Sequence, residues 1–457
     1  MVSEMPATSA RHLGIKPADN LPGQLASAKM PFDHMRKVLV PLLFLALLTV
    51  STPAQTLSPD EKAIVDYIDK HNPEALSFLE KVVNIESPTE DFAGVKNVGM
   101  AFGDEFKSLG MTIKWIDMPA EMKRSGHLVA ELPGTKGKRI LLLGHVDTVL
   151  RGEKYRAEGT KAFGTGVGDM KGGDVIILQA LKALKATGAL KDRQVIVMLT
   201  GDEEATGLPD TISRGPMRDL AKRSDLALSF ESAVLNTATV GRRGFSNWTL
   251  EVTAKTGHSS AIFREGMGDG AIFEASRILN EFREKLGNEK YLTFNPSLML
   301  GGTTVDQADT SGSATGKLNV ISAKVVVTGD LRFISDAQKE ATRKTMTDIV
   351  AANLPGTSAK ITFKDGTPAM SPVDGNYALM KQLDQVSKDL GQGPVTALDP
   401  GERGAGDIAY ISGIIPGLDG LGIGGNINSH AKGESAQIDT LAPNTKRIAL
   451  LLYRLTR

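Results

Sequence analysis

The sequence predicts an α/β protein: a mixed, mostly parallel sheet with helices on both faces, plus an inserted α+β domain of ferredoxin-like type. Three observations support this fold class. Short, continuously apolar runs alternate with amphipathic helical stretches up to residue 240, as expected for buried parallel strands. From 241 to 368 apolar and polar residues alternate, which is typical of half-exposed antiparallel strands. Helices and glycine-rich loops return over 369–457.

The first segment, residues 55–240, begins with helical spacing and continues with buried strands. The stretch SPDEKAIVDYIDKHNPEALSFLEKVVNIES predicts one or two opening helices after its Ser-Pro-Asp-Glu start. Buried strands are predicted at KRILLLGHVDTV, RQVIVMLTGDEE and SDLALSFESA. An amphipathic helix, GGDVIILQALKALKATG, lies between the first two of them. Strand, helix and strand in turn indicate βαβ units.

The insertion, residues 241–368, has its own pattern. Half-exposed strands are predicted at GFSNWTLEVTAKT and KLNVISAKVVVTGDLRF, each followed by a helix, and one more strand at AKITFKDG. Residues 369–457 then return to the first domain with the helices NYALMKQLDQVSKDLG and NTKRIALLLYRL. The chain therefore divides into a discontinuous first domain, 55–240 and 369–457, and the insertion.

Composition narrows the function classes. A chain of 457 residues exceeds one ordinary domain, and 41% hydrophobic residues with 48 glycines fit a globular enzyme. Lys+Arg and Asp+Glu both number 53, so no basic excess points to nucleic acid. Cysteine is absent, which excludes thiolate metal sites, a cysteine nucleophile and disulfides.

Residues 35–54 have the pattern of a secretory signal peptide. Met-Arg-Lys precedes about 13 apolar residues and a small-x-small site that ends at Ala54. The run is too short for a membrane span. A buried core helix would leave its basic start and Pro-Ala end unexplained. We therefore expect an upstream extension at 1–34, a mature chain from about Gln55, and a periplasmic or secreted protein without a stable membrane anchor.

Acidic and histidine side chains follow the three predicted strands. His145 and Asp147 end the first strand, Glu203 and Glu204 follow the second, and Glu231 follows the third. Asp169 lies between them in the glycine-rich loop FGTGVGDMKGG. Because ligands of open α/β sheets bind at the carboxyl ends of strands, we expect these side chains to converge on one crevice.

Each residue also has a purely structural interpretation. Asp169 alone would be a helix cap, and a Glu-Glu pair after a strand is ordinarily solvated loop. A lone histidine is more often structural than a ligand. The joint pattern favours a site, because histidines are scarce and three of them, His145, His258 and His430, lie in turns rich in glycine or small residues.

Imidazole and carboxylate donors without thiolates suit Zn²⁺, and Mn²⁺ or Co²⁺ also fit. Two ions about 3.5–4 Å apart need one bridging carboxylate and about two further ligands each. This count is supplied by His145, Asp169, Glu204, Glu231 and His430. Glu203 remains as a general base toward water, and Asp147 can orient the neighbouring His145 imidazole.

The motifs GHVDTV, GTGVGDMKGG, GDEE, ESA and SHAKGE resemble, in order and spacing from residue 60 to the C-terminus, the signatures of the co-catalytic zinc peptidases and deacylases. That family includes aminoacylase-1, succinyl-diaminopimelate desuccinylase and glutamate carboxypeptidase of the carboxypeptidase G type. The resemblance implies that Asp169 is the bridging aspartate and Glu203 the catalytic glutamate. It implies the remaining ligands at His145, Glu204, Glu231 and His430.

The resemblance also implies that the insertion is a lid, commonly a dimerisation domain, so we expect a homodimer. His258 in TGHSS matches a lid histidine that reaches a neighbouring active site and stabilises the tetrahedral oxyanion. Arg332 in GDLRF matches an arginine that binds the substrate's free carboxylate, and Asn319 in LNVIS a neighbouring polar contact. Taken alone, Arg332 is an ordinary surface arginine on a strand.

Two segments depart from the family pattern. The family usually has a small glycine-serine turn after the three acids, whereas this chain has ATGLPDTISRGP. The third ligand occurs as FESA, where Pro or Gly often follows the acid. Neither departure removes a ligand, so we expect both to affect the choice of substrate rather than the chemistry.

The leading hypothesis is a dinuclear zinc hydrolase of amide bonds, an exopeptidase of the carboxypeptidase type acting on small peptides. A deacylase of N-acyl amino acids or a dipeptidase is the alternative within this chemistry. A dimeric scaffold with an inactive metal site is a third hypothesis. The complete set of five ligands together with Glu203 argues against it.

Overall fold

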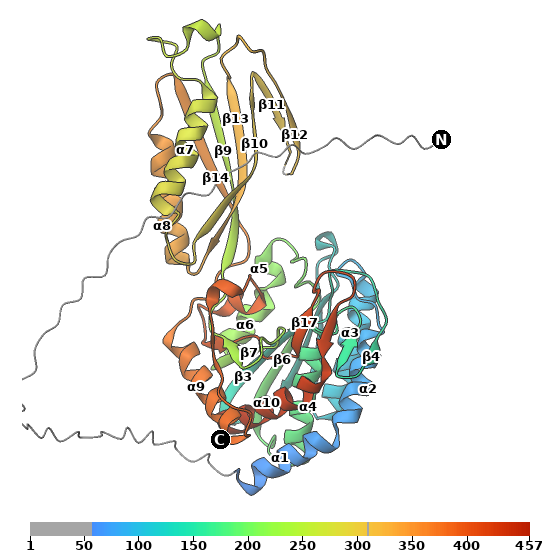
Figure 1. Ribbon diagram of the computed structural model, residues 1–457. Coiled ribbons are helices and arrows are strands. Elements are labelled where there is room, and N and C mark those ends of the chain that lie inside the picture. The colour runs from blue at the N-terminus through green and yellow to red at the C-terminus, as the bar shows by residue number, and fades with distance from the viewer. Residues whose placement is uncertain (1–56, 309) are drawn as a thin grey trace, which may run out of the picture. The chain divides into compact units, whose positions relative to one another are not determined.

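The computed structural model describes residues 57–308 and 310–457 (Figure 1). The expected upstream extension, 1–34, and signal peptide, 35–54, lie outside the described residues. Within the described ranges, no helix combines the length and the apolar character that crossing a membrane requires.

Among the described residues, a six-stranded sheet forms the core of the sheet domain, residues 57–240 and 369–457. Its strands lie in the order β1–β2–β6–β3–β7–β16. They are β1 (Thr112–Asp117), β2 (Gly126–Leu132), β3 (Lys136–His145), β6 (Arg193–Thr200), β7 (Leu226–Ser229) and β16 (Gly417–Leu418). The pairs β6–β3, β3–β7 and β7–β16 are parallel, whereas the pairs β1–β2 and β2–β6 are antiparallel. The predicted mixed, mostly parallel sheet is confirmed.

Helices cover both faces of this sheet because its central strands are apolar on both sides. In β3, Ile140 and Leu142 belong to a core shared with α1–α4, α9 and α10, whereas Leu141 and Leu143 pack with α6. The helices are α1 (Pro59–Lys70), α2 (Asn72–Val83), α3 (Phe92–Ser108), α4 (Lys171–Ala186), α5 (Asp210–Ser213), α6 (Gly215–Lys222), α9 (Asp374–Asp389) and α10 (Leu441–Leu455).

The opening stretch forms two helices, and local chemistry explains where the first begins. The Ser58 side chain accepts a hydrogen bond from the Glu61 backbone N–H, and Glu61 accepts one from the Ser58 N–H. Pro59, at the first helical position, lacks an N–H that would otherwise be unpaired. The predicted Ser-Pro-Asp-Glu start is thus a capping box.

Parallel pairing brings the carboxyl ends of β3, β6 and β7 to the same edge of the sheet. A small sheet, in the order β17–β18–β5–β4, also forms part of this region. Its strands are β4 (Arg156–Glu158), β5 (Lys161–Phe163), β17 (Gly424–Ile427) and β18 (Ser435–Gln437). Because β18 pairs with β5, the loop 428–434 lies near the glycine-rich loop 164–170. Elsewhere β8 (Thr237–Thr239) pairs in parallel with β15 (Thr396–Leu398).

The inserted domain, residues 241–368, is built as β-α-β-β-α-β. Its elements are β9 (Gly244–Ala254), α7 (Ala271–Leu286), β10 (Thr293–Gly302), β13 (Lys324–Phe333), α8 (Asp336–Ala351) and β14 (Thr357–Asp365). The antiparallel order β10–β13–β9–β14 is that of a ferredoxin-like domain. Trp248 and Phe282 meet edge to face in its separate core. A hairpin, β11 (Thr304–Gln307) and β12 (Gly312–Thr315), extends from it.

Two features of the insertion differ from the sequence prediction. The expected long strand through LNVIS is wrong at its start, because residues 318–319 form a turn, Val320 forms an isolated bridge with His258, and β13 begins only at Lys324. There Ile321 N–H donates to the Gly257 carbonyl instead of joining the sheet. Strand β10 was not predicted, since Pro296 interrupts its pattern. An edge strand tolerates proline, and the register of β10 shifts between Pro296 and Leu298.

Candidate metal centre

The carboxyl ends of β3, β6 and β7 bring acids and an imidazole together. His145 is the last residue of β3, while Glu203 and Glu204 follow β6 and Glu231 follows β7. Ligand atoms of His145, Glu203 and Glu231 lie within 4.8 Å of one another. Those of His145, Asp169 and Glu204 form a second such group. His145 is common to both groups and lies at the centre of the cluster.

Asp169 lies between two imidazoles. One carboxylate oxygen is 3.3 Å from Nε2 of His145, and the other is 3.1 Å from Nε2 of His430. A carboxylate whose two oxygens face two imidazoles has the arrangement needed to bridge a pair of metal ions.

His430 reaches the cluster from the loop between β17 and β18. Its Nε2 is 3.0 Å from a carboxylate oxygen of Glu204. The backbone of His430 has φ 65°, in the left-handed region that non-glycine residues rarely adopt. Such conformations persist only where surrounding structure enforces them, and they concentrate at functional sites. The pairing of β18 with β5 supplies that surrounding structure.

The protonation of His145 favours a cation at this position. Its Nδ1 is 3.1 Å from the main-chain carbonyl of Asp147, an acceptor, so Nδ1 carries the proton. In the neutral ring, Nε2 then presents a lone pair. This buried atom has no hydrogen-bond partner and lies 3.3 Å from Asp169 and 3.7 Å from Glu231. A lone pair facing two carboxylates requires a proton or a metal ion between them.

Charge crowding perturbs the acids in the cluster. Burial raises the pKa of Glu203 well above its ordinary value, and the nearby Glu231 raises it further. Burial and the charge of Asp169 raise the pKa of Glu231 to about 7. Burial opposes ionisation of Asp169 as well, but His145 and His430 bring its pKa below the usual range. Such a concentration of buried negative charge needs a cation.

The donor set fits divalent metal ions. The five side chains that can hold them are His145, Asp169, Glu204, Glu231 and His430. Imidazole nitrogens and carboxylate oxygens without thiolates are ligands suited to zinc or a similar first-row ion. The unpartnered Nε2 of His145 is the observation that decides this fit.

Asp147 holds the backbone beside the cluster. One of its carboxylate oxygens accepts from the Glu203 N–H at 3.1 Å, and the other accepts from the Glu204 N–H at 3.2 Å and from the Thr89 hydroxyl at 2.8 Å. The carboxylate is 3.5 Å from Nδ1 of His145, so the main-chain carbonyl is the nearer partner of that imidazole. Asp147 is therefore placed to orient both His145 and the Glu203–Glu204 turn.

Glu434, in the segment SHAKGE, was not predicted from the sequence as a site residue. Its buried carboxylate accepts from the backbone N–H groups of Gly166 at 2.7 Å, Gly168 at 2.9 Å and Asp169 at 3.0 Å. Glu434 thus fixes the loop that carries the central aspartate. The available signal was an acid four residues after His430 in a glycine-rich segment.

Of the three consecutive acids after β6, Asp202 does not join the cluster. Its buried carboxylate pairs with Arg214 and accepts from the Gly207 N–H at 2.8 Å and the Ser213 hydroxyl at 2.6 Å. All three partners come from ATGLPDTISRGP, the segment that departs from the family pattern. The cation for Asp202 is therefore an arginine rather than a metal. Ala205, Thr206, Leu208 and Asp210 of this segment line a cavity together with Glu203 and Glu204.

Comparison with known proteins identifies the family. The model of peptidase family M20/M25/M40 matches residues 141–454. The chain belongs to this family.

Two curated relatives and one solved structure accompany that match. Carboxypeptidase G2 of Pseudomonas sp. (strain RS-16) is 29% identical over 84% of this chain and 89% of its own. Succinyl-diaminopimelate desuccinylase of Gluconobacter oxydans (strain 621H) is 24% identical over 79% and 91%. A dinuclear metal-binding M20 peptidase from Bacillus subtilis has a TM-score of 0.60 and 14% identity over 85% and 99%. This M20 chain is therefore a metallopeptidase or amidohydrolase with the M20 fold.

The structure places His258 and Asn319 of this M20 protein together in the inserted domain. The Ser259 N–H donates to the Asn319 carbonyl at 2.9 Å, and the His258 imidazole lies 2.9 Å from the Ser260 hydroxyl. Neither His258 nor Asn319 belongs to the candidate metal groups found among the described residues.

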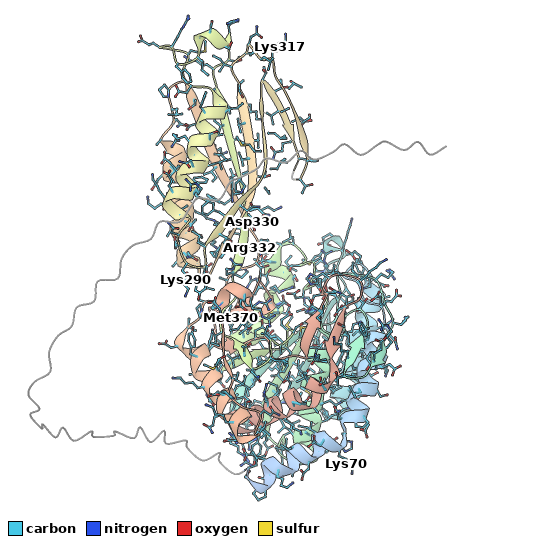
Figure 2. The ribbon with its side chains drawn as sticks, viewed as in Figure 1. Lys70, Lys290, Lys317, Asp330, Arg332 and Met370 are labelled. Atoms are coloured by element: carbon cyan, nitrogen blue, oxygen red, sulfur yellow. The ribbon has the colours of Figure 1, made fainter. Side chains whose placement is uncertain are left out.

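Arg332 lies elsewhere in the same domain. Its Nε donates to Asp330 at 2.9 Å, and its guanidinium lies 5.0 Å from the centre of the Phe245 ring. Asn319 precedes the first residue of β13, whereas Arg332 is next to its last. Figure 2 shows Lys317, which precedes β13, and Arg332 at opposite ends of the inserted domain. A rise of about 3.4 Å per residue places Arg332 roughly 27 Å from Lys324, the first residue of the strand.

Proposed function

We propose that this protein is an exported M20 carboxypeptidase. It hydrolyses the amide bond next to a free carboxylate, as the name of its carboxypeptidase relative suggests. The observation that carries the proposal is the placement of Asp169 between His145 and His430, with Glu203 beside the same cluster. Two divalent ions held there, zinc first among them, would supply Lewis-acid activation of the amide carbonyl and of the attacking water.

In this proposal the ligands divide into two sets that share Asp169. His145 and Glu231 complete one set, because their facing atoms are 3.7 Å apart. Glu204 and His430 complete the other, with facing atoms 3.0 Å apart. Asp147 keeps the His145 proton on Nδ1, so Nε2 remains available as a ligand.

Glu203 acts as the general base. It takes a proton from the attacking water and delivers it to the nitrogen of the leaving amine. Burial first and then Glu231 raise the pKa of Glu203, which favours uptake of a proton from the attacking water. The Asp147 carboxylate, bound to the Glu203 N–H, keeps this turn in place.

The inserted domain binds the substrate. Arg332 pairs with the free carboxylate, while Asn319 and His258 contact the scissile carbonyl, where His258 donates a hydrogen bond to the developing oxyanion. Because Asn319 precedes the first residue of β13 whereas Arg332 is next to its last, one chain does not supply all three to one small substrate. We therefore propose a homodimer through the inserted domain, in which His258 and Asn319 serve the neighbouring chain's site.

An N-acyl-amino-acid deacylase or dipeptidase is the second candidate, favoured by the desuccinylase relative. Hydrolysis of a panel of N-acyl amino acids, dipeptides and C-terminally amidated analogues separates the two. A carboxypeptidase cleaves peptides with varied C-terminal residues, whereas a deacylase requires the small acyl group. Substrates amidated at the C-terminus should fail, because they lack the carboxylate that Arg332 binds.

The catalytic part of the proposal is tested with Glu203→Gln. This variant should retain its metal ions, measured by elemental analysis, yet lose turnover by about 10²–10⁴-fold. Near-normal turnover would transfer the base role to another group. Export is tested by N-terminal sequencing of the natural protein, which should begin near Gln55. Recovery of intact residues 35–54 on a cytoplasmic protein would contradict export.

A further inference from the structure

The peptide group that joins Asp202 to Glu203 is held at both ends. Its oxygen, the Asp202 carbonyl, accepts from the Arg214 guanidinium at 3.1 Å. Its nitrogen, the Glu203 N–H, donates to Asp147 at 3.1 Å. A peptide group fixed at both oxygen and nitrogen cannot rotate, so the direction in which the Glu203 side chain leaves the backbone is set.

Arg214 is itself immobilised by buried acids. Its guanidinium contacts the Asp202 carboxylate, donates through Nε to Asp407 at 2.7 Å, and reaches the Thr206 hydroxyl at 3.3 Å. Asp407 in turn accepts from the hydroxyl of Thr200, the last residue of β6, at 2.7 Å. The side chain of Arg214 is fully buried, so none of these contacts competes with water. The network thus anchors the turn after β6 to the end of the strand.

We propose that Arg214 is a positioning residue for Glu203 and, through the same turn, for Glu204. This inference rests on the proposed role of Glu203 as the general base. Among the described residues, the hydrogen bonds of the Arg214 guanidinium go to Asp202, Ser213, Thr206 and Asp407, none of which is a predicted metal ligand. Arg214 acts by fixing the peptide group from which Glu203 projects. This role would also explain the segment ATGLPDTISRGP. Its Gly207 N–H and Ser213 hydroxyl donate to the Asp202 carboxylate, and its Arg214 pairs with the same carboxylate.

The test compares Arg214→Lys with a matched control, Arg454→Met. Arg454 also bridges two acids of the sheet domain, Glu61 and Asp389, each at 2.7 Å, but it has no contact with the turn. Lysine keeps the charge of Arg214 but lacks the planar fork that reaches Asp202, its carbonyl and Asp407 at once. Each variant is measured for melting temperature, zinc affinity by competition with a chelator, kcat and KM.

We expect Arg214→Lys to lower kcat by about 10–10²-fold with little change in KM, because small displacements of a reacting group cost this much. Zinc affinity should fall as well, since Glu204 shares the turn. Arg454→Met should lower the melting temperature while kcat and zinc affinity stay at the wild-type level. Wild-type kcat in Arg214→Lys would overturn the inference. An equal kcat loss in Arg454→Met at matched stability would also overturn it.

A double-mutant cycle separates this inference from the proposed function. If Arg214 acts through Glu203, adding Arg214→Lys to Glu203→Gln should cost little further turnover. Fully multiplicative losses would show that Arg214 acts by another route, while Glu203 stays the base. An active Glu203→Gln enzyme would instead refute the proposed function. If Arg214→Lys does not fold, Asp202→Asn tests the inference in its place. It keeps the side-chain shape but removes the ion pair, and unchanged kcat there would overturn the inference.

Discussion

A carboxylate oxygen of Asp169 lies 3.1 Å from Nε2 of His430, although one residue belongs to the loop after β5 and the other to the loop after β17. Asp169 is the only group in the cluster, among the described residues, whose two oxygens face two different imidazoles. Asp169→Asn should therefore reduce bound metal from two ions per chain to at most one, because an amide nitrogen cannot bind a cation.

Elemental analysis after dialysis measures this effect. Asp219→Asn, which changes an exposed aspartate paired with Lys222 on α6, is the control and should retain the wild-type metal content. Two tightly held ions in Asp169→Asn would show that another group bridges them.

Glu434→Gln should weaken metal binding by about 10–100-fold, because partners that orient a ligand typically contribute this much. In the wild type, both carboxylate oxygens accept hydrogen bonds from backbone N–H groups. The amide keeps one acceptor oxygen, but its NH₂ group cannot accept from the N–H groups that it faces. Glu153→Gln is the matched control, since Glu153 is exposed and accepts one bond from the neighbouring Gly433 N–H. Equal zinc affinity in both variants would refute the role of Glu434.

His127 predicts a pH dependence of stability that is independent of the metals. Its buried ring accepts from the Gly201 N–H at 3.2 Å and faces the Ser213 carbonyl at 2.9 Å, so Nε2 carries the only proton. Burial lowers the pKa of His127, and the charge of Asp202 offsets only part of that effect. The unfolded chain binds a proton near pH 6.5 that the folded protein does not bind. The stabilisation is thus complete above about pH 6.5 and is lost as pH falls below it.

Urea unfolding of wild type and His127→Gln between about pH 5 and pH 8 checks this. Glutamine can make both hydrogen bonds but does not titrate. The free energy of unfolding of the wild type minus that of His127→Gln should therefore be constant at the upper end of this pH range. It should decrease toward the lower end. Parallel curves throughout would mean that His127 titrates alike in both states.

His258→Ala should lower kcat by about 10²–10³-fold while leaving metal content unchanged, because a donor to the oxyanion is lost. Mixing this variant with Glu203→Gln tests the proposed dimer. If His258 serves the neighbouring chain, a mixed dimer regains one complete site from the intact Glu203 of one chain and the intact His258 of the other. Mixtures as inactive as the separate variants, despite proven subunit exchange, would rule out this arrangement.

The strand ends explain why much of the cluster was predictable. Apolar runs reveal β3, β6 and β7, and parallel pairing brings the residues after these strands to one edge, so His145, Glu203 and Glu231 had to lie close together. The sequence alone also shows that these residues are of types that bind metal ions. The arrangement of Asp169 between two imidazoles was not, because it depends on the pairing of β18 with β5, strands of three residues each.

The supporting residues had weaker signals. Glu434 acts through backbone N–H groups, which every loop possesses, so no residue type marks its partners. Arg214 and Asp407 become neighbours only through tertiary packing, and in the sequence each looks like a solvated charge. Strand β10 was missed because Pro296 breaks its alternation. The late start of β13 was missed because residues 318–322 alternate like a strand.

The contact between Asp169 and Glu434 also determines when the centre can form. Asp169 belongs to the part of the chain that precedes the inserted domain, whereas His430 and Glu434 follow it near the C-terminus. During synthesis, the ligand set therefore stays incomplete until the segment that follows the inserted domain has also been made. Metal ions bound afterwards cross-link both segments of the sheet domain and, by mass action, favour the folded chain over the unfolded one. Metal capture thus requires both segments of the sheet domain, and a chain cut before β18 should neither retain metal nor gain stability from it.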